Sequence, residues 1–331
     1  MPFPLTLKLC LAGCLSLFVN ICFGQLKWQN VDAQFGTLPA SVHVYKTTDS
    51  IEGKPNVAYY VEADLQDKSL EFTVDTTLQR RLKPSEFFEK NSQPLLVVNA
   101  TFFSFESNKN LNVVIKKGKI VGYNINSVPG RGKDTFTYRH PFVSALGISK
   151  KRKPDVAWIL TDSTKASAYA SQLPVASFKD SVKYPSFSYI KNYATKETST
   201  NSMAHFSKWK METAIGGGPT LLQDGKVKIT NNEELKFGGK AIGDKHPRTA
   251  MGYTQDGKLI VLVIQGRFAG IAEGATLTQE AEILKNIGCW EALNLDGGGS
   301  SCMLVNGKET ITPCDKPGQR PVPAVFMIQK K

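Results

Sequence analysis

The sequence has little of what several protein classes require. Its one long apolar run, Leu9–Phe23, is shorter than the ~20 residues that cross a bilayer, which excludes a polytopic membrane protein. Only six cysteines and four histidines occur in 331 residues. A chain of this length does not depend on disulfides, and its histidines form no cluster with acidic residues at metal-ligand spacing. The 27 glycines show no G-X-Y period, which excludes collagen.

The remaining composition is that of a globular protein. Hydrophobic residues make up 41% and charged residues 21%, which excludes an intrinsically disordered chain. The net charge is +12, yet no nucleic-acid-binding motif accompanies the largest basic block, Ser149–Lys153. We therefore expect no nucleic-acid partner. The charge indicates either a diffuse basic surface or attraction to phosphate-bearing substrates, and it leaves the oligomeric state open.

Residues 1–24 are predicted to be a cleaved secretion signal. Lys8 precedes the apolar run, and Cys22-Phe23-Gly24 ends in the kind of residue that signal peptidase reads. Cleavage before Gln25 lowers the net charge to +11, because the segment contains one Lys and no acidic residue, and it leaves no transmembrane span. We expect a secreted or periplasmic protein. The alternative is a lipoprotein, since Leu11-Ala12-Gly13-Cys14 resembles a cleavage box that would acylate Cys14.

Three cysteines remain after that cleavage. Cys302 and Cys314 bracket a short loop containing Gly, Asn and Pro, and they are the preferred disulfide pair. Cys289 follows an apolar helix and is expected to be a buried packing residue. The odd number is equally consistent with three reduced thiols.

Short apolar runs separated by turn dipeptides indicate antiparallel hairpins. Lys117-Gly118, Asp224-Gly225 and Asp256-Gly257 each lie between two such runs. Leu259–Ile264 does not alternate, which predicts a central strand covered on both faces.

One segment strongly predicts a helix, Leu277–Ile287. Thr276 and Gln279 form a capping box at its start, and Gly288 is the expected stop. With so few helices among the hairpins, the expected fold class is α+β, mostly antiparallel β-sheet built from hairpins with a few helices.

The expected organisation has three parts. The signal peptide is followed by an N-terminal β-rich region, residues 25–93, and then by a catalytic domain, residues 94–331. Within that domain, residues 150–212 are rich in Ser, Thr, Lys and aromatic residues and are interpreted as a probable insertion.

The most informative segment is Asn294–Ser301, where a predicted strand ends on Asp296. Three glycines follow, Gly297–Gly299, at a cost in backbone entropy. They indicate either a nest of N–H groups that binds an anion or a tight turn. The segment is not a nucleophile elbow, because Cys302 stands where a glycine is needed. It is not a P-loop, because no lysine follows the glycines.

Three further segments carry candidate residues. His246-Pro247-Arg248-Thr249 opens a hairpin, and its arginine presents a planar fork suited to phosphate or carboxylate; a surface salt bridge is the alternative. Gly216-Gly217-Gly218-Pro219 again places glycines where a strand begins. Asn99 ends an apolar strand just ahead of Phe102 and Phe103.

These segments together resemble the phosphodiester glycosidase family. The Asn-Leu-Asp-Gly-Gly-Gly-Ser and His-Pro-Arg-Thr-Ala strings are specific as a pair. The resemblance covers residues 94–331, and the matching elements follow the family's order: Val98–Phe103, Gly216–Leu222 with Asp224-Gly225-Lys226, His246–Gly252, Asn294–Ser301 and Gly318–Val322.

The resemblance implies a secreted hydrolase of bacterial type that cleaves a glycosyl 1-phosphodiester at the anomeric carbon. It implies a phosphate-bearing glycan or sugar phosphodiester as partner, with no cofactor and no metal. Catalytic roles are implied for Asp296, Arg248 and Ser300. Substrate-binding roles are implied for the other matched residues: Asn99, Gly217, Gly218, His246, Thr249, Gly297, Gly298, Gly299 and Arg320.

Hydrolysis at an anomeric carbon passes through an oxocarbenium-like state and usually engages carboxylates. Asp296 is the candidate nucleophile, base or charge stabiliser, and Arg248 and Arg320 would stabilise the departing phosphate. No second carboxylate is identified, although Asp244 and Glu273 lie near the motifs in sequence. Two alternatives remain: a non-catalytic glycan- or phosphate-binding protein on the same fold, and a metal-dependent phosphodiesterase.

Overall fold

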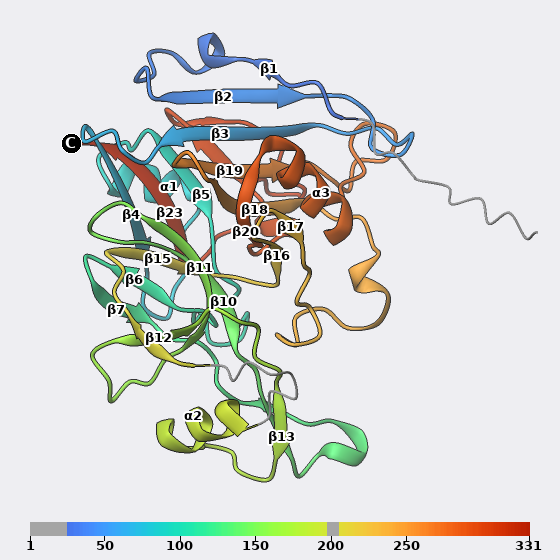
Figure 1. Cartoon of the computed structure of the whole chain (residues 1–331). Coiled ribbons are helices and arrows are strands. Elements are labelled where there is room, and N and C mark those ends of the chain that lie inside the picture. The colour runs from blue at the N-terminus through green and yellow to red at the C-terminus, as the bar shows by residue number, and fades with distance from the viewer. Residues whose placement is uncertain (1–24, 197–204) are drawn as a thin grey trace, which may run out of the picture.

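The computed structural model describes residues 25–196 and 205–331 (Figure 1). The predicted signal peptide, with Cys14, lies outside the described residues. Every strand pairing in the described part is antiparallel. The expected antiparallel sheet with few helices is confirmed, and the balance is more strongly β than α+β suggests. None of the described helices is long and apolar enough to cross a membrane.

The largest sheet has eight strands in the order β1-β2-β3-β19-β18-β20-β16-β17. Their bounds are Gln29–Asn30, Val42–Thr47, Ala58–Asp64, Lys258–Ile264, Arg248–Thr254, Cys289–Asn294, Thr220–Gln223 and Lys226–Val227. The run that does not alternate, β19, lies between β3 and β18, and its residues 259–264 are all buried. The predicted central strand is therefore confirmed.

A second sheet has seven strands in the order β14-β12-β11-β10-β15-β6-β7. Their bounds are Ser207–Trp209, Ala168–Ser171, Pro154–Leu160, Val143–Ile148, Thr213–Gly216, Val114–Lys116 and Lys119–Gly122. The segment 150–212, interpreted from the sequence as an insertion, thus supplies three neighbouring strands, β11, β12 and β14. The same segment also forms β13 (Phe178–Asp180) and α2 (Phe187–Lys196).

A third sheet has five strands in the order β22-β21-β5-β23-β4. Their bounds are Lys308–Glu309, Met303–Val305, Leu96–Asn99, Ala324–Lys330 and Leu70–Thr76. A small sheet, β13-β9-β8, adds Tyr138–His140 and Val128–Pro129 to β13. Because β3 pairs with β19 and β4 pairs with β23, residues 25–93 are built into the sheets formed by the rest of the chain.

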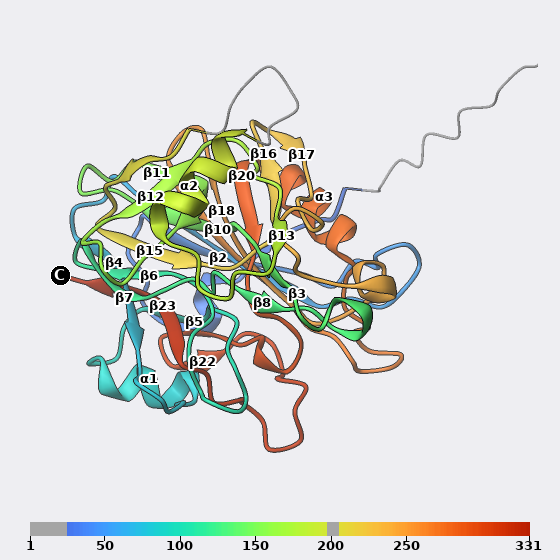
Figure 2. The same cartoon turned by 90° about the horizontal axis from the view of Figure 1, so that it is seen from below.

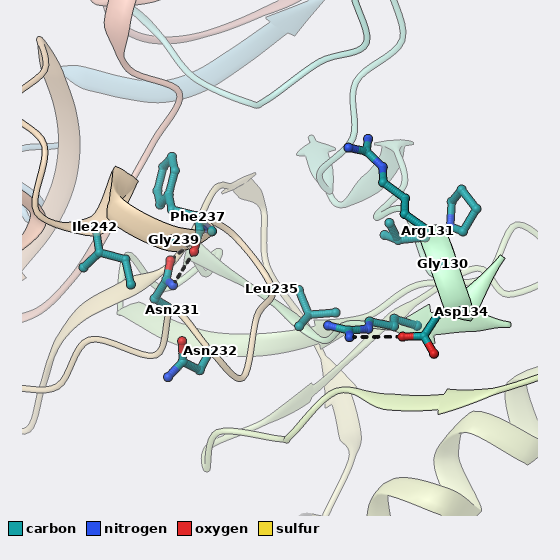
Figure 3. Close-up of a pocket in the computed structure, with 13 residues that line it drawn as sticks. Gly130, Arg131, Asp134, Asn231, Asn232, Leu235, Phe237, Gly239 and Ile242 are labelled. Atoms are coloured by element: carbon teal, nitrogen blue, oxygen red, sulfur yellow. Dashed lines mark hydrogen bonds and ion pairs between the residues drawn. The ribbon is translucent and has the colours of Figure 1, made fainter.

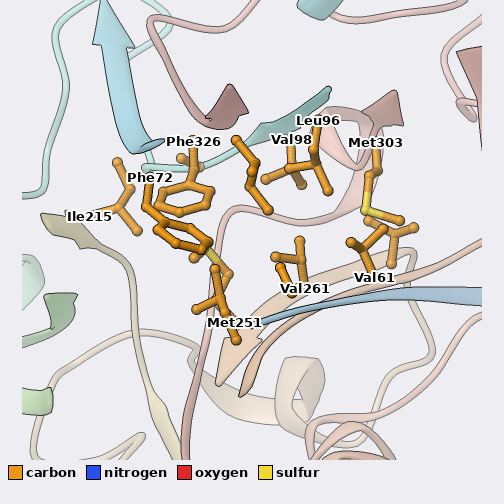
Figure 4. Packing of buried hydrophobic residues seen from close by; sticks show 14 of the residues in the cluster. Val61, Phe72, Leu96, Val98, Ile215, Met251, Val261, Met303 and Phe326 are labelled. Atoms are coloured by element: carbon orange, nitrogen blue, oxygen red, sulfur yellow. The ribbon is translucent and has the colours of Figure 1, made fainter. Parts of the chain in front are cut away.

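Two hydrophobic clusters lie on opposite faces of the eight-stranded sheet. On one face, Val61, Met251 and Val261 pack against Val98 and Phe326 of the five-stranded sheet (Figure 4). On the other face, α3 (Leu277–Ile287) packs its apolar residues against β16, β18 and β20. Viewed from below, α3 and α1 (Pro84–Lys90) lie on opposite sides of the molecule (Figure 2).

The predicted helix α3 is confirmed at both ends. Thr276 and Gln279 make both bonds of the capping box, and Gly288 ends the helix in the left-handed region with φ of 105°. Gly is favoured there because a Cβ would crowd the backbone.

Of the two alternatives for the cysteines, three reduced thiols is the one found, and the preferred pair Cys302 and Cys314 is not bonded. All three described cysteines are free. Cys302 packs with Val97 and Leu304 in a buried cluster, whereas Cys314 lies in a partly exposed loop beside Arg267, whose Nη1 is 3.7 Å from its Sγ. The two thiols therefore point into different surroundings. The prediction that Cys289 is a buried packing residue is confirmed.

Candidate active site

Asp296 lies just beyond β20, where the eight-stranded and five-stranded sheets meet. Its N–H donates to the carbonyl of Ala100, with N and O 2.9 Å apart. Its own carbonyl accepts from Nδ2 of Asn99 at 2.6 Å. The end of β5 therefore holds the backbone of Asp296 at both its N–H and its carbonyl.

Asn99 and Thr249 were expected to bind substrate, but both are fully buried. Oδ1 of Asn99 accepts from the Thr249 hydroxyl at 2.9 Å and from the N–H of Cys302 at 3.0 Å. Each polar atom of the Asn99 amide thus has a partner within the protein. The two side chains therefore hold the glycine segment in place, and their role in binding substrate stays a prediction.

The three glycines of the motif are explained by crowding. Gly298 has a φ of 63°, which disfavours other residues. A Cβ on Gly299 would overlap the Arg320 guanidinium and the Asp315 carboxylate, and one on Gly297 would lie 2.8 Å from the Pro247 carbonyl. The N–H of Gly298 donates to that same carbonyl at 2.8 Å, so it is not available to the predicted anion nest. The glycines instead let charged side chains approach the turn.

The Asp296 carboxyl has an unusual electrostatic environment. Burial raises its pKa to about 6, while a hydrogen bond from Ser300 and the charges of Arg320 and Lys236 oppose this rise. Burial also lowers the pKa of Lys236 to about 8, against the charges of Glu234 and Asp296. A carboxylate and an ammonium therefore face each other with pKa values on either side of neutral pH, which is typical of catalytic sites.

Arg320 lies against the other side of the turn. Its Nε and Nη2 donate to the two carboxylate oxygens of Asp315 at 2.7 and 3.0 Å. Its Nη1 lies 3.4 Å from the Ser300 hydroxyl. The guanidinium edge that would take a phosphate is therefore occupied by a carboxylate, and Nη1 is directed toward Ser300. Ser300 links the two charged groups, because its hydroxyl also bonds Asp296.

Aromatic rings cover both cations. Nζ of Lys236 lies 4.4 Å from the centre of the Phe102 ring, and Cζ of Arg320 lies 5.4 Å from that of Phe105. Both rings belong to the segment that follows Asn99. Such cation–π contacts are worth about 0.5–2 kcal/mol each, and they fix the positions of the two charges beside Asp296.

Arg248 is placed differently from the prediction. It is only 2% exposed. Its Nε donates to the Ala275 carbonyl at 2.8 Å, and its Nη2 donates to the Asp244 carbonyl at 3.1 Å. The Nε–Nη2 edge of Arg248 thus binds main-chain oxygens, and its predicted bidentate contact with phosphate stays a prediction. Among acidic groups, the buried Glu280 on α3 has the largest effect on the pKa of Arg248, and it opposes the lowering caused by burial.

His246 and Arg267 form a rim beside the glycine turn. Nδ1 of His246 lies 3.4 Å from Nη2 of Arg267, and the Arg267 guanidinium is next to Gly298. Burial, together with Arg248 and Arg267, lowers the pKa of His246. This imidazole is therefore neutral at pH 7, and it can accept or donate a hydrogen bond without carrying charge.

Gly217 and Gly218 were also expected to bind substrate, and both are buried. A Cβ on Gly217 would overlap the Asn294 carbonyl, and one on Gly218 would overlap the carboxylate of Glu234. Glu234 accepts five hydrogen bonds, from the backbone and side chain of Ser144, from the backbone of Thr220 and from the side chains of Thr230 and Trp158. These glycines permit close packing behind Lys236, and their role in binding substrate stays a prediction.

The structure brings together residues that the sequence analysis missed. Lys236, Asp315 and Arg267 all lie in loops or at strand ends without an apolar pattern around them. The only sequence signal for Asp315 is its position five residues before Arg320. Asp244 and Glu273, noted from the sequence, lie elsewhere: only the carbonyl of Asp244 reaches Arg248, and Glu273 pairs with Lys54 at 3.9 Å. In the described ranges, no group of three or more His, Cys, Asp or Glu could hold a metal ion.

The sequence is similar to those of known proteins. The family model of phosphodiester glycosidases matches residues 92–329. A 109-residue segment, 30% of this chain, is 28% identical to mouse N-acetylglucosamine-1-phosphodiester alpha-N-acetylglucosaminidase. A 64-residue segment, 19% of the chain, is 41% identical to the uncharacterised SPbeta prophage-derived protein YomE of Bacillus subtilis. The matches span only 21% and 10% of those two proteins.

The fold is also similar to a solved structure. The catalytic domain of the zebrafish N-acetylglucosamine-1-phosphodiester alpha-N-acetylglucosaminidase superposes with a TM-score of 0.57 at 19% identity. The superposition covers 93% of this chain and 89% of that one. At this level of identity the likeness concerns the fold.

Proposed function

Since the chain belongs to the phosphodiester glycosidase family, we propose that it hydrolyses glycosyl 1-phosphodiesters at the anomeric carbon. The observation that carries the proposal is the Asp296 carboxyl, with a pKa of about 6, between the cations Lys236 and Arg320. Such a group is mostly ionised at pH 7, and it lies where a negative leaving group would find two positive charges.

In the proposed reaction, water adds to the anomeric carbon and the bond from that carbon to the phosphate oxygen breaks. The bonding electrons leave with the phosphate, which departs as a phosphomonoester, and the sugar keeps the oxygen of water. Asp296 stabilises the positive charge that develops at the ring. Arg320, through Nη1, and Lys236 stabilise the negative charge that develops on the phosphate. Ser300 orients the carboxylate by its hydrogen bond.

The acidity of the leaving group accounts for the lack of an assigned general acid. A phosphomonoester leaves as an anion and needs little protonation, so Arg320 and Lys236 can stabilise its charge in place of a general acid. Whether Asp296 acts as nucleophile or as base follows from the configuration of the released sugar, since retention requires a covalent intermediate and inversion does not.

The test is a panel of α- and β-linked methyl phosphodiesters of glucose, galactose, mannose and N-acetylglucosamine, incubated in water enriched in oxygen-18. Cleavage at the anomeric carbon puts the label into the free sugar. Cleavage at phosphorus puts the label into the phosphate and would identify a phosphodiesterase, and a chelator arm shows whether that activity needs a metal. Binding without turnover of any compound would favour a glycan-binding protein instead.

We also propose that the reaction takes place outside the cytoplasm, after removal of residues 1–24. The support is the apolar run ahead of Gln25. Intact-mass measurement of the mature protein tests this, and the mass of a diacylated N-terminal Cys14 would contradict cleavage before Gln25 and indicate a membrane-anchored lipoprotein.

A further inference from the structure

Half of the exposed large apolar side chains in the described part of the chain lie in one small region. Six of the twelve belong to residues 125–140 and 174–196, which include the sheet β13-β9-β8 and α2 and which we call the lobe. Figure 1 shows β13 and α2 at one end of the molecule, away from α1 and α3, and this end faces the viewer in Figure 2. Phe136 and Tyr184 are 88% and 81% exposed. Exposed apolar side chains that gather in this way mark interaction surfaces.

Phe136 lies at the tip of an ordered turn between β8 and β9. The N–H of Gly130 donates to the carbonyl of Thr137 at 2.8 Å, and the N–H of Asp134 donates to the carbonyl of Arg131 at 3.1 Å. The backbone of the turn is therefore held by its own hydrogen bonds, and the aromatic ring is exposed without being needed to close it.

The lobe also has a buried core of its own. The rings of Phe178 and Tyr193 stack with their centres 3.9 Å apart, and Phe178 and Ile190 are buried together. Nε2 of His140 lies 3.0 Å from Oδ1 of Asp180, which joins β9 to the end of β13. The lobe is thus packed without burying its two exposed rings.

The surface around these rings is strongly basic. The lobe contains seven Lys or Arg and two Asp, a net charge of +5 with histidine neutral. Asp134 already faces two cations, with Arg139 at 3.8 Å and Lys179 at 2.7 Å. Figure 3 shows the pair with Arg139 and shows the side chain of Arg131 directed away from Asp134. Within the described residues, neither Arg131 nor Lys133 has a carboxylate partner, so an anionic partner is favoured here.

The second exposed ring has a lysine beside it. Nζ of Lys183 lies 5.1 Å from the centre of the Tyr184 ring. The carbonyl of Lys183 accepts from the Ser127 hydroxyl at 2.7 Å, which ties this turn to the start of β8. Aromatic rings with a cation beside them are typical of protein segments at a membrane–water interface, where the ring enters the headgroup region and the charge stays in water.

These features favour a bilayer surface over other anionic partners. The centres of protein interfaces are depleted in lysine, whereas lysine surrounds both rings of the lobe. Single-stranded nucleic acids bind along a groove on which successive bases stack, whereas Phe136 and Tyr184 lie on separate turns. A bilayer with anionic lipid attracts Lys and Arg and accepts aromatic rings among its headgroups.

From this surface we propose that the lobe docks the protein onto bilayers that contain anionic lipid. Phe136 and Tyr184 enter the headgroup region, and Arg131, Lys133 and Lys183 lie over the lipid phosphates. The docking goes beyond the proposed function and is independent of it, because none of these residues takes part in the proposed hydrolysis.

Flotation of the purified protein with lipid vesicles tests the docking. The protein should float with vesicles of phosphatidylcholine that contain about 30% phosphatidylglycerol, and not with phosphatidylcholine alone. The double variant Phe136→Ser with Tyr184→Ser should bind about 10-fold more weakly, because both rings are removed from the headgroup region. The control Leu78→Ser with Ile271→Ser removes two exposed apolar side chains outside the lobe and should bind like the wild type.

Charge reversal separates the lobe from the net charge of the protein. Lys133→Glu with Lys183→Glu should weaken binding by about 10-fold or more, and added salt should weaken binding of the wild type. Lys150→Glu with Lys151→Glu makes the same change in the basic block 149–153 outside the lobe, and it should bind within about twofold of the wild type. All of these side chains are exposed or partly exposed, so thermal unfolding should show the same melting temperature for every variant.

The proposal is overturned if the protein does not bind the anionic vesicles, or if the lobe variants and their controls lose binding equally. Binding that survives the two serine substitutions would contradict entry of the rings. Light scattering and a labelled single-stranded oligonucleotide test the other partners. A dimer that the serine substitutions dissociate would make the lobe an interface between copies, and oligonucleotide binding that depends on the lobe, without vesicle binding, would make it a nucleic-acid site. Either result would also overturn the proposal, and no measurement in this set depends on turnover.

Discussion

Two arginines predicted to share one task, Arg248 and Arg320, lie in contrasting surroundings. Arg320 belongs to a loop, is partly exposed, and gives its Nε–Nη2 edge to the carboxylate of Asp315. Arg248 begins β18, is 2% exposed, and gives the same edge to two main-chain carbonyls. One guanidinium is thus paired with a carboxylate along one edge and keeps Nη1 toward Ser300, whereas the other is buried with main-chain oxygens as its partners.

The difference follows from strand geometry. Neighbouring residues of a strand point to opposite faces. Thr249 and Met251 face the cluster shared with the five-stranded sheet, where Asn99 also lies, whereas Arg248 and Ala250 face α3. A conspicuous sequence string can therefore supply residues to two different environments, and membership in the string does not assign them one role.

The largest effect is expected at Asp296. Asp296→Asn keeps the shape but removes the charge, so turnover should fall by about 10³-fold or more while the melting temperature changes little. The controls are a full thermal unfolding curve and Asp244→Asn, which removes an exposed carboxylate near the motif. A stable Asp296→Asn protein with near-normal turnover would remove Asp296 from the mechanism. Loss of activity that follows a lowered melting temperature would make its role structural.

Matched lysine substitutions of the two arginines should give opposite results. Lysine keeps the charge and removes the fork. Arg320→Lys should lower kcat/KM by about 10- to 100-fold with a small effect on stability, because Arg320 lies beside Ser300 and the leaving group. Arg248→Lys should leave kcat/KM within about threefold but destabilise the protein by ~1–3 kcal/mol, because buried carbonyls lose their donors.

Both variants are to be measured by steady-state kinetics and by chemical denaturation. If Arg248→Lys loses activity at unchanged stability, the original expectation of a phosphate contact at Arg248 is restored. If Arg320→Lys is fully active, Arg320 is only the partner of Asp315.

Local signals account for what was predictable in the fold. The capping box at Thr276 and the stop at Gly288 directly flank α3 in the sequence, so the helix could be predicted from local residues alone. The pairing of β4 with β23 joins residues 70–76 to residues 324–330, and β10 lies between β11 and the distant β15. Such long-range pairings leave no local mark in the sequence.

The residues of the site also differ in whether the local sequence predicts them. The position of Asp296 was readable because three glycines after a strand are rare. The role of Lys236 depends on Asp296, 60 residues away, and that of Asp315 on the glycine turn at Gly299, 16 residues away, both brought close by the fold. Side chains alternate along β18, so Thr249 and Met251 on one face predict Arg248 on the other face. Grouping Arg248 with the string His-Pro-Arg-Thr assigned it to the site instead.

A smaller effect is expected at Lys236. Its pKa of about 8 predicts a loss of kcat/KM as the pH rises through that value, because deprotonation removes a positive charge from the site. The rise in kcat/KM on the acid side, near pH 6, belongs to ionisation of Asp296.

Lys236→Met should lower activity by about 10-fold and abolish the fall in activity at alkaline pH. It should also move the acid limb of the pH profile to higher pH, because the cation that favours the Asp296 carboxylate is gone. Lys226→Met, an exposed lysine on β17, should leave the pH profile unchanged, and an alkaline limb that persists in Lys236→Met must arise from another group.

The smallest effect on turnover, and a distinct effect on stability, is expected behind Arg248. Glu280 is fully buried, and neither of its carboxyl oxygens has a hydrogen-bond partner among the described residues. Burial raises its pKa from 4.5 to about 8 despite the charge of Arg248. Because the folded pKa is higher than the unfolded one, the unfolded state releases the proton first. Stability is therefore lost as the pH rises from about 4.5 to about 8 and is constant above that.

Glu280→Gln should keep turnover within about twofold. At pH 8.5 the variant should be more stable than the wild-type protein by on the order of 4 kcal/mol, and this difference should vanish toward pH 4.5. Glu282→Gln, on the same helix but partly exposed, should show no such trend. Parallel stability curves for wild type and Glu280→Gln across this range would mean that Glu280 is ionised in the folded protein, and that Arg248 is neutralised from the α3 side as fully as Arg320 is by Asp315.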